Sequence, residues 1–293
     1  MRWWLFLLGF GLFLGSSQAW ALMEDFDVQS SVILEVEGHA CMGEDRSRKE
    51  TRELAVAETK RKAAEMALTH IKSKTTVESA IVSSDIINAY TLAKVRVIEE
   101  KEKGWFMSKY AGECYRVRLK VEVIPDPDAL TEVVKEKSLI DDPKAPLTVK
   151  LWTDKERYQI GEKIKIYLKG NKPFYAKIVY QDATGRLIQL MPNPYRSDNH
   201  FNGGVIYEIP SGRDRFELEV NPPIGKESIT LYASTAQLGE LDLTPAGGIY
   251  MVQTRSREVG MKTRGVKVIE KKGVSPGSPV GFTEVKIEVS TGE

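Results

Sequence analysis

The sequence predicts an α+β N-terminal domain, with a three-stranded sheet and one long helix, followed by an all-β immunoglobulin-like sandwich. In the first half, segments in which apolar and polar residues alternate flank a long segment with apolar residues at helical spacing. In the second half, short alternating segments recur between turn residues, which is typical of a β-sandwich. A stretch rich in Asp and Pro separates the halves, and 293 residues suffice for two domains.

Residues 1–21 have the pattern of an export signal. A positively charged start and a short apolar run lead to an A-x-A site formed by Ala19 and Ala21. We expect cleavage after Ala21, a mature chain that begins at Leu22, and a location in the bacterial periplasm or outside the cell. No cysteine lies at the cleavage point, so we expect no lipid anchor. No later apolar run approaches the roughly 20 residues of a membrane helix, so we expect no transmembrane helix after signal cleavage.

The first domain, residues 22–125, is predicted to have the order strand, helix, strand, strand. Ser47 and Glu50 form a capping box at the start of an amphipathic helix whose apolar side is rich in alanine. The segment from Thr75 to Thr91 fits either a second short helix or a loop. The other predicted elements are a first strand Val32 to Cys41, the helix Ser47 to Ile71, a second strand Lys94 to Glu99, a charged hairpin Lys101 to Gly112 and a last strand Glu113 to Ile124.

The two cysteines, Cys41 and Cys114, lie on the polar sides of the first and last strands. An oxidising compartment favours a disulfide between them, whereas the same residues in the cytosol would be free thiols. If the strands pair antiparallel with the cysteines opposite each other, Glu37 faces Arg118, which is a favourable cross-strand pair. That register places the last strand in the middle, so the predicted sheet order is 1-3-2.

Residues 126–146 are predicted to form a linker that contains a short helix. The sandwich is expected at 147–235. The extension at 236–293 is expected to end in a closing hairpin between Gly265 to Glu270 and Phe282 to Ser290. The strands expected in the sandwich are Leu147 to Trp152, Lys163 to Leu168, Phe174 to Tyr180, Arg186 to Leu190, Val205 to Ile209, Arg215 to Val220 and Ser228 to Ala233.

The first domain contains three features in a fixed order: the segment Val36-Glu37-Gly38-His39-Ala40, then the alanine-rich helix, then the strand from Tyr115 to Val123. This pattern resembles the N-terminal domain of flagellar assembly protein T and of related envelope lipoproteins. The resemblance implies a role in an envelope scaffold or in assembly rather than a reaction.

The second domain carries a longer series of motifs, which are Tyr158-x-Ile160-Gly161-Glu162, a turn at Gly185, Leu190-Met191-Pro192-Asn193, Gly203-Gly204, Ile209-Pro210 and Pro223-x-Gly225-x-Glu227. In this order they are similar to the domain of unknown function 4384 (DUF4384) family. The resemblance implies a bacterial, often exported module that senses or binds, and that elsewhere is fused to kinase or caspase-like domains.

The composition and motifs favour neither a nucleic-acid-binding protein nor an enzyme. The 42 Lys and Arg residues nearly balance the 41 Asp and Glu residues, and a nucleic-acid binder normally carries a clustered basic excess. The three histidines, His39, His70 and His200, lie in separate segments and form no zinc motif. The chain after the export signal has no phosphate loop or dinucleotide fingerprint. We expect no catalytic residues, no metal and no cofactor.

Two surfaces are candidates for recognition. The loop from Pro192 to Asn202 is long for a hairpin and mixes aromatic with hydrogen-bonding groups, although its start alternatively only shapes a turn. The tip of the charged hairpin carries aromatic residues of the kind that dock partners, although they alternatively fold back on the helix. The candidate residues are Pro192, Asn193, Tyr195, Arg196, Asn199 and His200 in the loop, and Trp105, Phe106 and Tyr110 at the tip.

These observations lead to one main functional expectation. We expect an exported, non-enzymatic scaffold or adaptor of the cell envelope that binds another envelope protein. The alternative is a module that binds or senses a small ligand or a glycan through the loop from Pro192 to Asn202.

Overall fold

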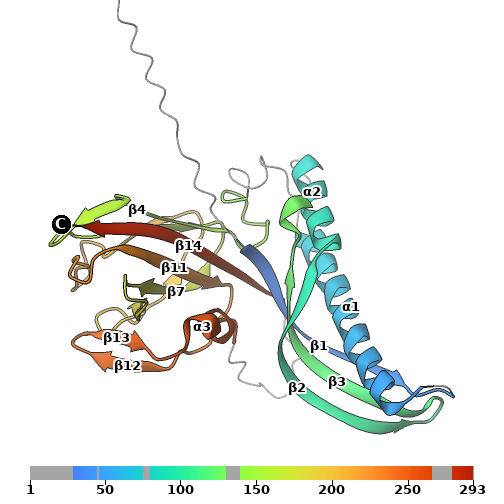
Figure 1. Ribbon diagram of the computed structural model, residues 1–293. Coiled ribbons are helices and arrows are strands. Elements are labelled where there is room, and N and C mark those ends of the chain that lie inside the picture. The colour runs from blue at the N-terminus through green and yellow to red at the C-terminus, as the bar shows by residue number, and fades with distance from the viewer. Residues whose placement is uncertain (1–28, 45, 75–79, 130–138, 266–278, 293) are drawn as a thin grey trace, which may run out of the picture.

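The computed structural model describes residues 29–44, 46–74, 80–129, 139–265 and 279–292 (Figure 1). This part of the chain is mostly β-structure, in one sheet of 11 strands and one of 3, with a few helices. The predicted export signal, with Ala19, Ala21 and Leu22, lies outside the described residues. The helices are α1 (Arg48–Lys74), α2 (Ala80–Thr91), α3 (Ser256–Thr263) and a 3₁₀ turn at Pro127–Ala129.

Most of the strands lie in the second half of the chain, as the sequence predicts. They are β1 (Gln29–Cys41), β2 (Lys94–Ser108), β3 (Gly112–Ile124), β4 (Val149–Thr153), β5 (Arg157–Gln159), β6 (Ile166–Gly170), β7 (Phe174–Gln181), β8 (Leu187–Met191), β9 (His200–Phe201), β10 (Ile206–Ile209), β11 (Lys226–Ser234), β12 (Leu243–Ala246), β13 (Ile249–Val252) and β14 (Val280–Gly292).

One sheet runs through both halves of the chain, because the last strand, β14, pairs on both sides. It is antiparallel to β11 over nine residue pairs and antiparallel to β1 over five. The strand order is therefore β12-β13-β8-β7-β11-β14-β1-β3-β2, and Figure 1 shows β14 passing from one half into the other. The order of β1, β3 and β2 matches the prediction. The expectation of a separate three-stranded sheet is wrong, because β14 occupies the edge of β1.

The first half of the sheet carries α1 on one side. β1 and β3 pair in the predicted register, so the two cysteines face each other, as do Glu37 and Arg118. On the other side of these strands, Ala55, Ala63 and Ala67 of α1 are fully buried against the apolar strand residues. Gly38 permits this close approach, since a Cβ at its position would lie 2.3 Å from Thr59 Oγ1. The helix begins as predicted, because the Ser47 amide donates to Glu50 Oε2 at 2.7 Å.

Two segments of this half were left open or differently predicted from the sequence. The segment from Thr75 to Thr91 contains a helix, α2, and residues 75–79 lie outside the described part. The region expected to be a charged hairpin from Lys101 is mostly strand, because β2 continues to Ser108 opposite β3. Register shifts beside Ile98 and between Glu100 and Glu102 allow this continuation. Such bulges break the regular alternation on which the shorter prediction rested.

The second half contains a core between two sheets. The small sheet has the order β10-β6-β4, and its inward residues pack against β7, β11 and β14 of the large sheet. The predicted strand from Arg215 to Val220 is wrong. This segment forms only a bridge between Glu219 and Lys163 and backbone hydrogen bonds such as that from the Ile164 amide to the Leu218 carbonyl, at 2.8 Å.

The extension after residue 235 covers the other side of the large sheet. The weak sequence pattern did not indicate β12, β13 and α3. Leu238 and Leu241, in the loop before β12, and Val259 of α3 pack onto Ile33 and Phe282 to form a third core. The predicted closing hairpin needs residues 266–270, which lie outside the described part. β14 pairs with β11 and β1 instead, so it joins the two halves rather than capping the second.

A buried ion pair fixes the junction between the halves. Glu122 of β3 is fully buried, and its Oε1 accepts hydrogen bonds from Arg264 Nε at 2.9 Å and Ser31 Oγ at 2.6 Å. Arg96 approaches the other carboxylate oxygen, and Arg264 also donates to Glu284 at 2.9 Å. Burial by itself would raise the pKa of Glu122, but the charge of Arg264 and the hydrogen bonds outweigh it and hold that pKa below its usual value.

Candidate functional site

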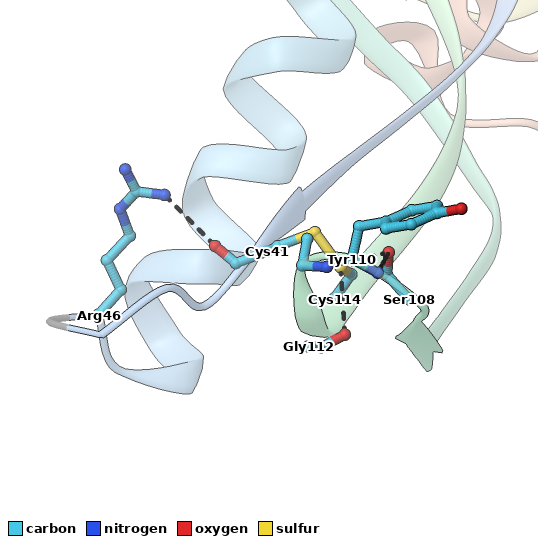
Figure 2. Close-up of a disulfide and its surroundings, with 7 residues drawn as sticks. Cys41, Arg46, Ser108, Tyr110, Gly112 and Cys114 are labelled. Carbon is cyan, nitrogen blue, oxygen red and sulfur yellow. Dashed lines mark hydrogen bonds between the residues drawn. A yellow bond between two sulfur atoms is a disulfide. The ribbon is translucent and has the colours of Figure 1, made fainter.

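The free end of the β2–β3 hairpin is the candidate site, and Figure 2 shows its disulfide. Cys41 and Cys114 are joined at facing positions of β1 and β3, next to the turn that connects β2 with β3. β2 supplies Phe106 opposite Cys114, so all three strands meet at this end. The disulfide therefore ties the hairpin to β1 where the strands would otherwise fray.

Three apolar side chains project from this end into solvent. The exposed fraction is 97% for Tyr110, 76% for Met107 and 37% for Phe106. The Ser108 hydroxyl accepts weak hydrogen bonds at 3.4 Å from the amides of Tyr110 and Ala111, which shapes the turn (Figure 2). We call Phe106, Met107 and Tyr110 the hairpin end. Its backbone is held by hydrogen bonds and a disulfide, and its side chains are open to a partner.

The predicted docking tip is corrected in two respects. Trp105 and Phe106 lie within β2 rather than in the turn, so they point to opposite sides of the sheet. Trp105 faces α1, where its ring contacts Tyr115 at 5.0 Å and lies under the Arg48 guanidinium at 4.9 Å. The alternative that the aromatic residues fold back on the helix is thus right for Trp105. Tyr110 lies in the turn, as predicted.

Met107 belongs to the hairpin end and was missed by the sequence prediction, which considered aromatic residues alone. Its signal was present, because Phe106, Met107 and Tyr110 form the apolar part of an otherwise charged segment. A large exposed apolar side chain beside two aromatic rings is informative, whereas isolated exposed apolar residues are common.

Charged groups surround the hairpin end on both sides of the sheet. On the α1 side, Arg48 pairs with Glu113. On the other side, the Arg116 guanidinium lies 5.9 Å from the centre of the Phe106 ring. Arg118 donates to Glu37 at 3.0 Å, and this hydrogen bond raises the pKa of Arg118. Phe106 and Met107 are successive strand residues and point to opposite sides of the sheet, so each side offers an exposed apolar side chain with charged groups nearby, a combination that protein interfaces also contain.

The loop from Pro192 to Asn202 has its own internal hydrogen bonds. Asn193 is buried, and its side-chain oxygen accepts bonds from the amides of Tyr195 and Arg196, each at 2.9 Å. Pro192 follows a cis peptide bond. Asn199 Nδ2 donates to a carbonyl of β7 at 3.1 Å. These contacts support the interpretation that the start of the loop shapes a turn.

The remaining loop residues also make contacts within the fold. Arg196 pairs with Asp214 at 3.0 Å, which leaves the side chain of Arg196 20% exposed. The His200 ring meets Tyr175 edge-on at 4.9 Å between centroids. Tyr195 stacks on Phe216 but stays 53% exposed. The predicted loop residues therefore mainly make contacts within the protein. Tyr195 is the one that stays largely exposed.

Two further observations concern the described residues alone. No group of three or more His, Cys, Asp or Glu side chains among them is arranged to hold a metal ion. None of the helices in this part of the chain is long and apolar enough to cross a membrane.

A segment in the second half of the chain is similar to a known family. Residues 157–237 match the model of the Domain of unknown function (DUF4384) family. The match runs from β5 to the end of β11 and confirms the resemblance of the C-terminal half to DUF4384. No curated protein and no solved structure matches the chain. The resemblance of the first half to flagellar assembly protein T stays a prediction.

Proposed function

We propose that the protein is an exported, non-enzymatic scaffold or adaptor of the bacterial cell envelope that binds another envelope protein through its hairpin end. The observation that carries this proposal is the exposure of Tyr110, Met107 and Phe106 next to the Cys41–Cys114 disulfide. Removing apolar surface from water is favourable by about 25 cal/mol per Å², so a partner that covers these side chains would be bound more tightly. A braced backbone also lowers the entropy lost on binding.

Other features support the same function. The export pattern of residues 1–21 and the pairing of the two cysteines agree with an oxidising compartment, the periplasm or the outside of the cell. The likeness of the first half to flagellar assembly protein T fits an assembly role. In this proposal the DUF4384 segment forms an immunoglobulin-like sandwich that serves as a binding accessory, and the shared sheet holds it at a fixed distance from the hairpin end.

A site-specific crosslinking experiment tests the docking surface. A photoreactive phenylalanine at position 110 in the full chain, expressed in its bacterial host, is expected to crosslink a defined envelope protein that mass spectrometry identifies. Met107→Ser and Tyr110→Ser are expected to reduce co-purification of that partner at least about tenfold, since each removes a large exposed apolar side chain from the hairpin end.

Leu92→Ser is the matched control. Leu92 is 61% exposed and lies before β2, at the opposite end of the hairpin from its turn. This variant also replaces a large exposed apolar side chain by serine, but away from the hairpin end, and it should co-purify with the partner as the unaltered chain does. Equal recovery with all three variants, or crosslinks spread over many unrelated proteins, would count against docking by the hairpin end.

A further inference from the structure

β2 lies at the edge of the large sheet. Among the strands that the structure describes, it comes last in the sheet order and pairs with β3 alone (Figure 1). Its 15 residues make it much longer than the usual strand of about five or six. A long edge strand presents a row of backbone N–H and C=O groups that can pair with another strand. The edge of β2 is therefore a candidate binding surface.

Six side chains of β2 lie on the side of the sheet that α1 covers. The register with β3 shows this, because facing residues of β3, such as Val117 and Leu119, pack against α1. Two bulges, with Ile98 and Lys101 as the extra residues, keep the six on one side despite their uneven spacing. We call these side chains the α1 row. In chain order they are Val95, Val97, Glu100, Lys103, Trp105 and Met107.

The apolar members of the α1 row are not fully covered by α1. Val95, Val97 and Trp105 pack against the core under α1 and yet stay half-buried. Met107 is 76% exposed. The centre of the row is charged, because it consists of Glu100 and Lys103, which form an exposed ion pair at 2.6 Å. The row therefore has an apolar part at each end and one acidic and one basic group between them.

One antiparallel register matches the α1 row with the same row of a second copy. In a two-fold symmetric pair of strands each contact occurs twice, because the same surface is used by both copies. With the bulges in place, opposite charges meet at the centre and apolar side chains meet on both flanks, and both kinds of cross-strand pair are favourable. The facing pairs are Glu100 with Lys103, Val97 with Trp105, and Val95 with Met107 of the second copy.

The neighbouring registers are unfavourable. A shift by one position of the row, in either direction, places Glu100 or Lys103 opposite its own counterpart, so that like charges meet. A shift by two positions places both charged groups opposite apolar side chains. Charged side chains and bulges commonly protect an edge strand from pairing. In β2 the same features exclude these registers and leave one that is self-complementary.

We infer that the protein forms a two-fold symmetric dimer through β2, in the register that sets Glu100 opposite Lys103 of the second copy. With a rise of about 3.4 Å per residue and a sheet depth of about 10 Å, the 15 residues of β2 offer roughly 500 Å² per copy. A total near 1,000 Å² is at the low end for specific interfaces, so the Kd is expected to be micromolar.

This inference goes beyond the proposed function. Met107 gains a neighbour in the second copy, whereas Tyr110 lies in the turn, past the last residue that pairs. The two hairpin ends then lie at opposite ends of the joined strands, and each keeps Tyr110 open to another protein.

Sedimentation velocity of the purified full chain across the micromolar concentration range tests the inference. The unaltered chain is expected to change from one copy to two. Glu100→Lys and Lys103→Glu each set like charges opposite each other at two symmetry-related places, so each should raise the Kd at least about tenfold. Lys49→Glu is the matched control, because it reverses a charge in an exposed ion pair on α1, and it should dimerise as the unaltered chain does.

An equimolar mixture of the two charge-reversal variants separates pairing from folding. Positions 100 and 103 are both basic in one variant and both acidic in the other, so each facing pair in a mixed dimer has opposite charges. The mixture should therefore dimerise although neither variant does so alone. The double variant, Glu100→Lys with Lys103→Glu, should also regain the dimer. A misfolded variant would show neither recovery.

Three results would overturn the inference. The first is a chain that stays monomeric across the micromolar range, as it would if another segment of the same chain covered β2. The second is a dimer that both single variants leave intact, and the third is a mixture of the two variants that stays monomeric. These measurements use the purified chain alone, whereas the crosslink from position 110 detects another protein, so either proposal can fail without the other.

Discussion

Replacing Arg264 by methionine should loosen the junction between the two halves of the protein. Arg264 is 3% exposed and donates both to the fully buried Glu122 and to Glu284. Methionine fills much of the same volume without a charge. The variant therefore leaves a buried carboxylate that has lost its main cation, while the apolar packing of the third core changes little.

The expected loss is about 3 kcal/mol in the free energy of unfolding at pH 7. Removing one partner of a buried ion pair typically costs about 3–5 kcal/mol. The lower end applies because Ser31 still donates to Glu122 at 2.6 Å, and because Arg96, whose side chain is 41% exposed, still pairs with it. Arg257→Met is the matched control, since Arg257 lies on α3, which ends directly before Arg264, with its side chain 74% exposed, and it should cost under about 0.5 kcal/mol.

The loss should depend on pH. Because the folded-state pKa of Glu122 is lowered, its pairing stabilises the folded protein above the ordinary glutamate pKa of about 4.3, and this stabilisation disappears as the pH falls through the folded-state pKa. The difference between Arg264→Met and the unaltered chain should therefore shrink below about pH 4.

Urea unfolding followed by circular dichroism at pH 7 and at low pH measures these differences, and hydrogen exchange of β1 and β14 localises them. The reasoning also requires coupling, so Arg264→Met should cost much less in a Glu122→Gln background than in the unaltered chain. A loss below 1 kcal/mol at pH 7, or a loss of equal size in both backgrounds, would refute it.

Three other changes test the fold and the site. Changing Cys41 and Cys114 together to serine should cost about 4 kcal/mol, because the bridge closes a loop with a sequence separation of 73; thermal unfolding with and without reductant measures this, and two free thiols in the denatured, unreduced chain would contradict it. Gly38→Ala should cost about 1–3 kcal/mol, since its Cβ would meet Thr59, and Thr59→Ala should restore part of the loss in urea titrations. Asn171→Leu should cost about 3 kcal/mol, because this buried amide forms hydrogen bonds with four backbone groups, and a midpoint shift no larger than that of a surface variant would disprove it.

The sequence predicted the first half of the sheet well where side-chain chemistry constrained it. The alternation around Cys41 and Cys114 placed both residues on polar strand sides, and opposite charges favoured one register between the two strands. The capping box at Ser47 marked the start of α1 within one residue. These features are local, or they depend on one pair of strands.

Prediction of the candidate site was less complete. Tyr110 and Phe106 were named, but the length of β2 was not, because the bulges near Glu100 interrupt the alternation that marks a strand. Trp105 consequently seemed to belong to the tip although it packs against α1. The contacts that occupy Arg196 come from Asp214 and Phe201, and no local pattern in the sequence indicates that pairing.

By itself, the sequence determined which faces of the strands are apolar, where the long helix begins, which cysteines can pair and which family the segment 157–237 resembles. Only the tertiary structure decided that β14 lies between β11 and β1, so that two expected domains share one sheet. It also decided that Glu122, on the polar side of its strand, is buried beneath Arg264. The physical reason is that alternation encodes which side of a strand meets the core, whereas the backbone groups along its edge accept any strand that packing brings beside them.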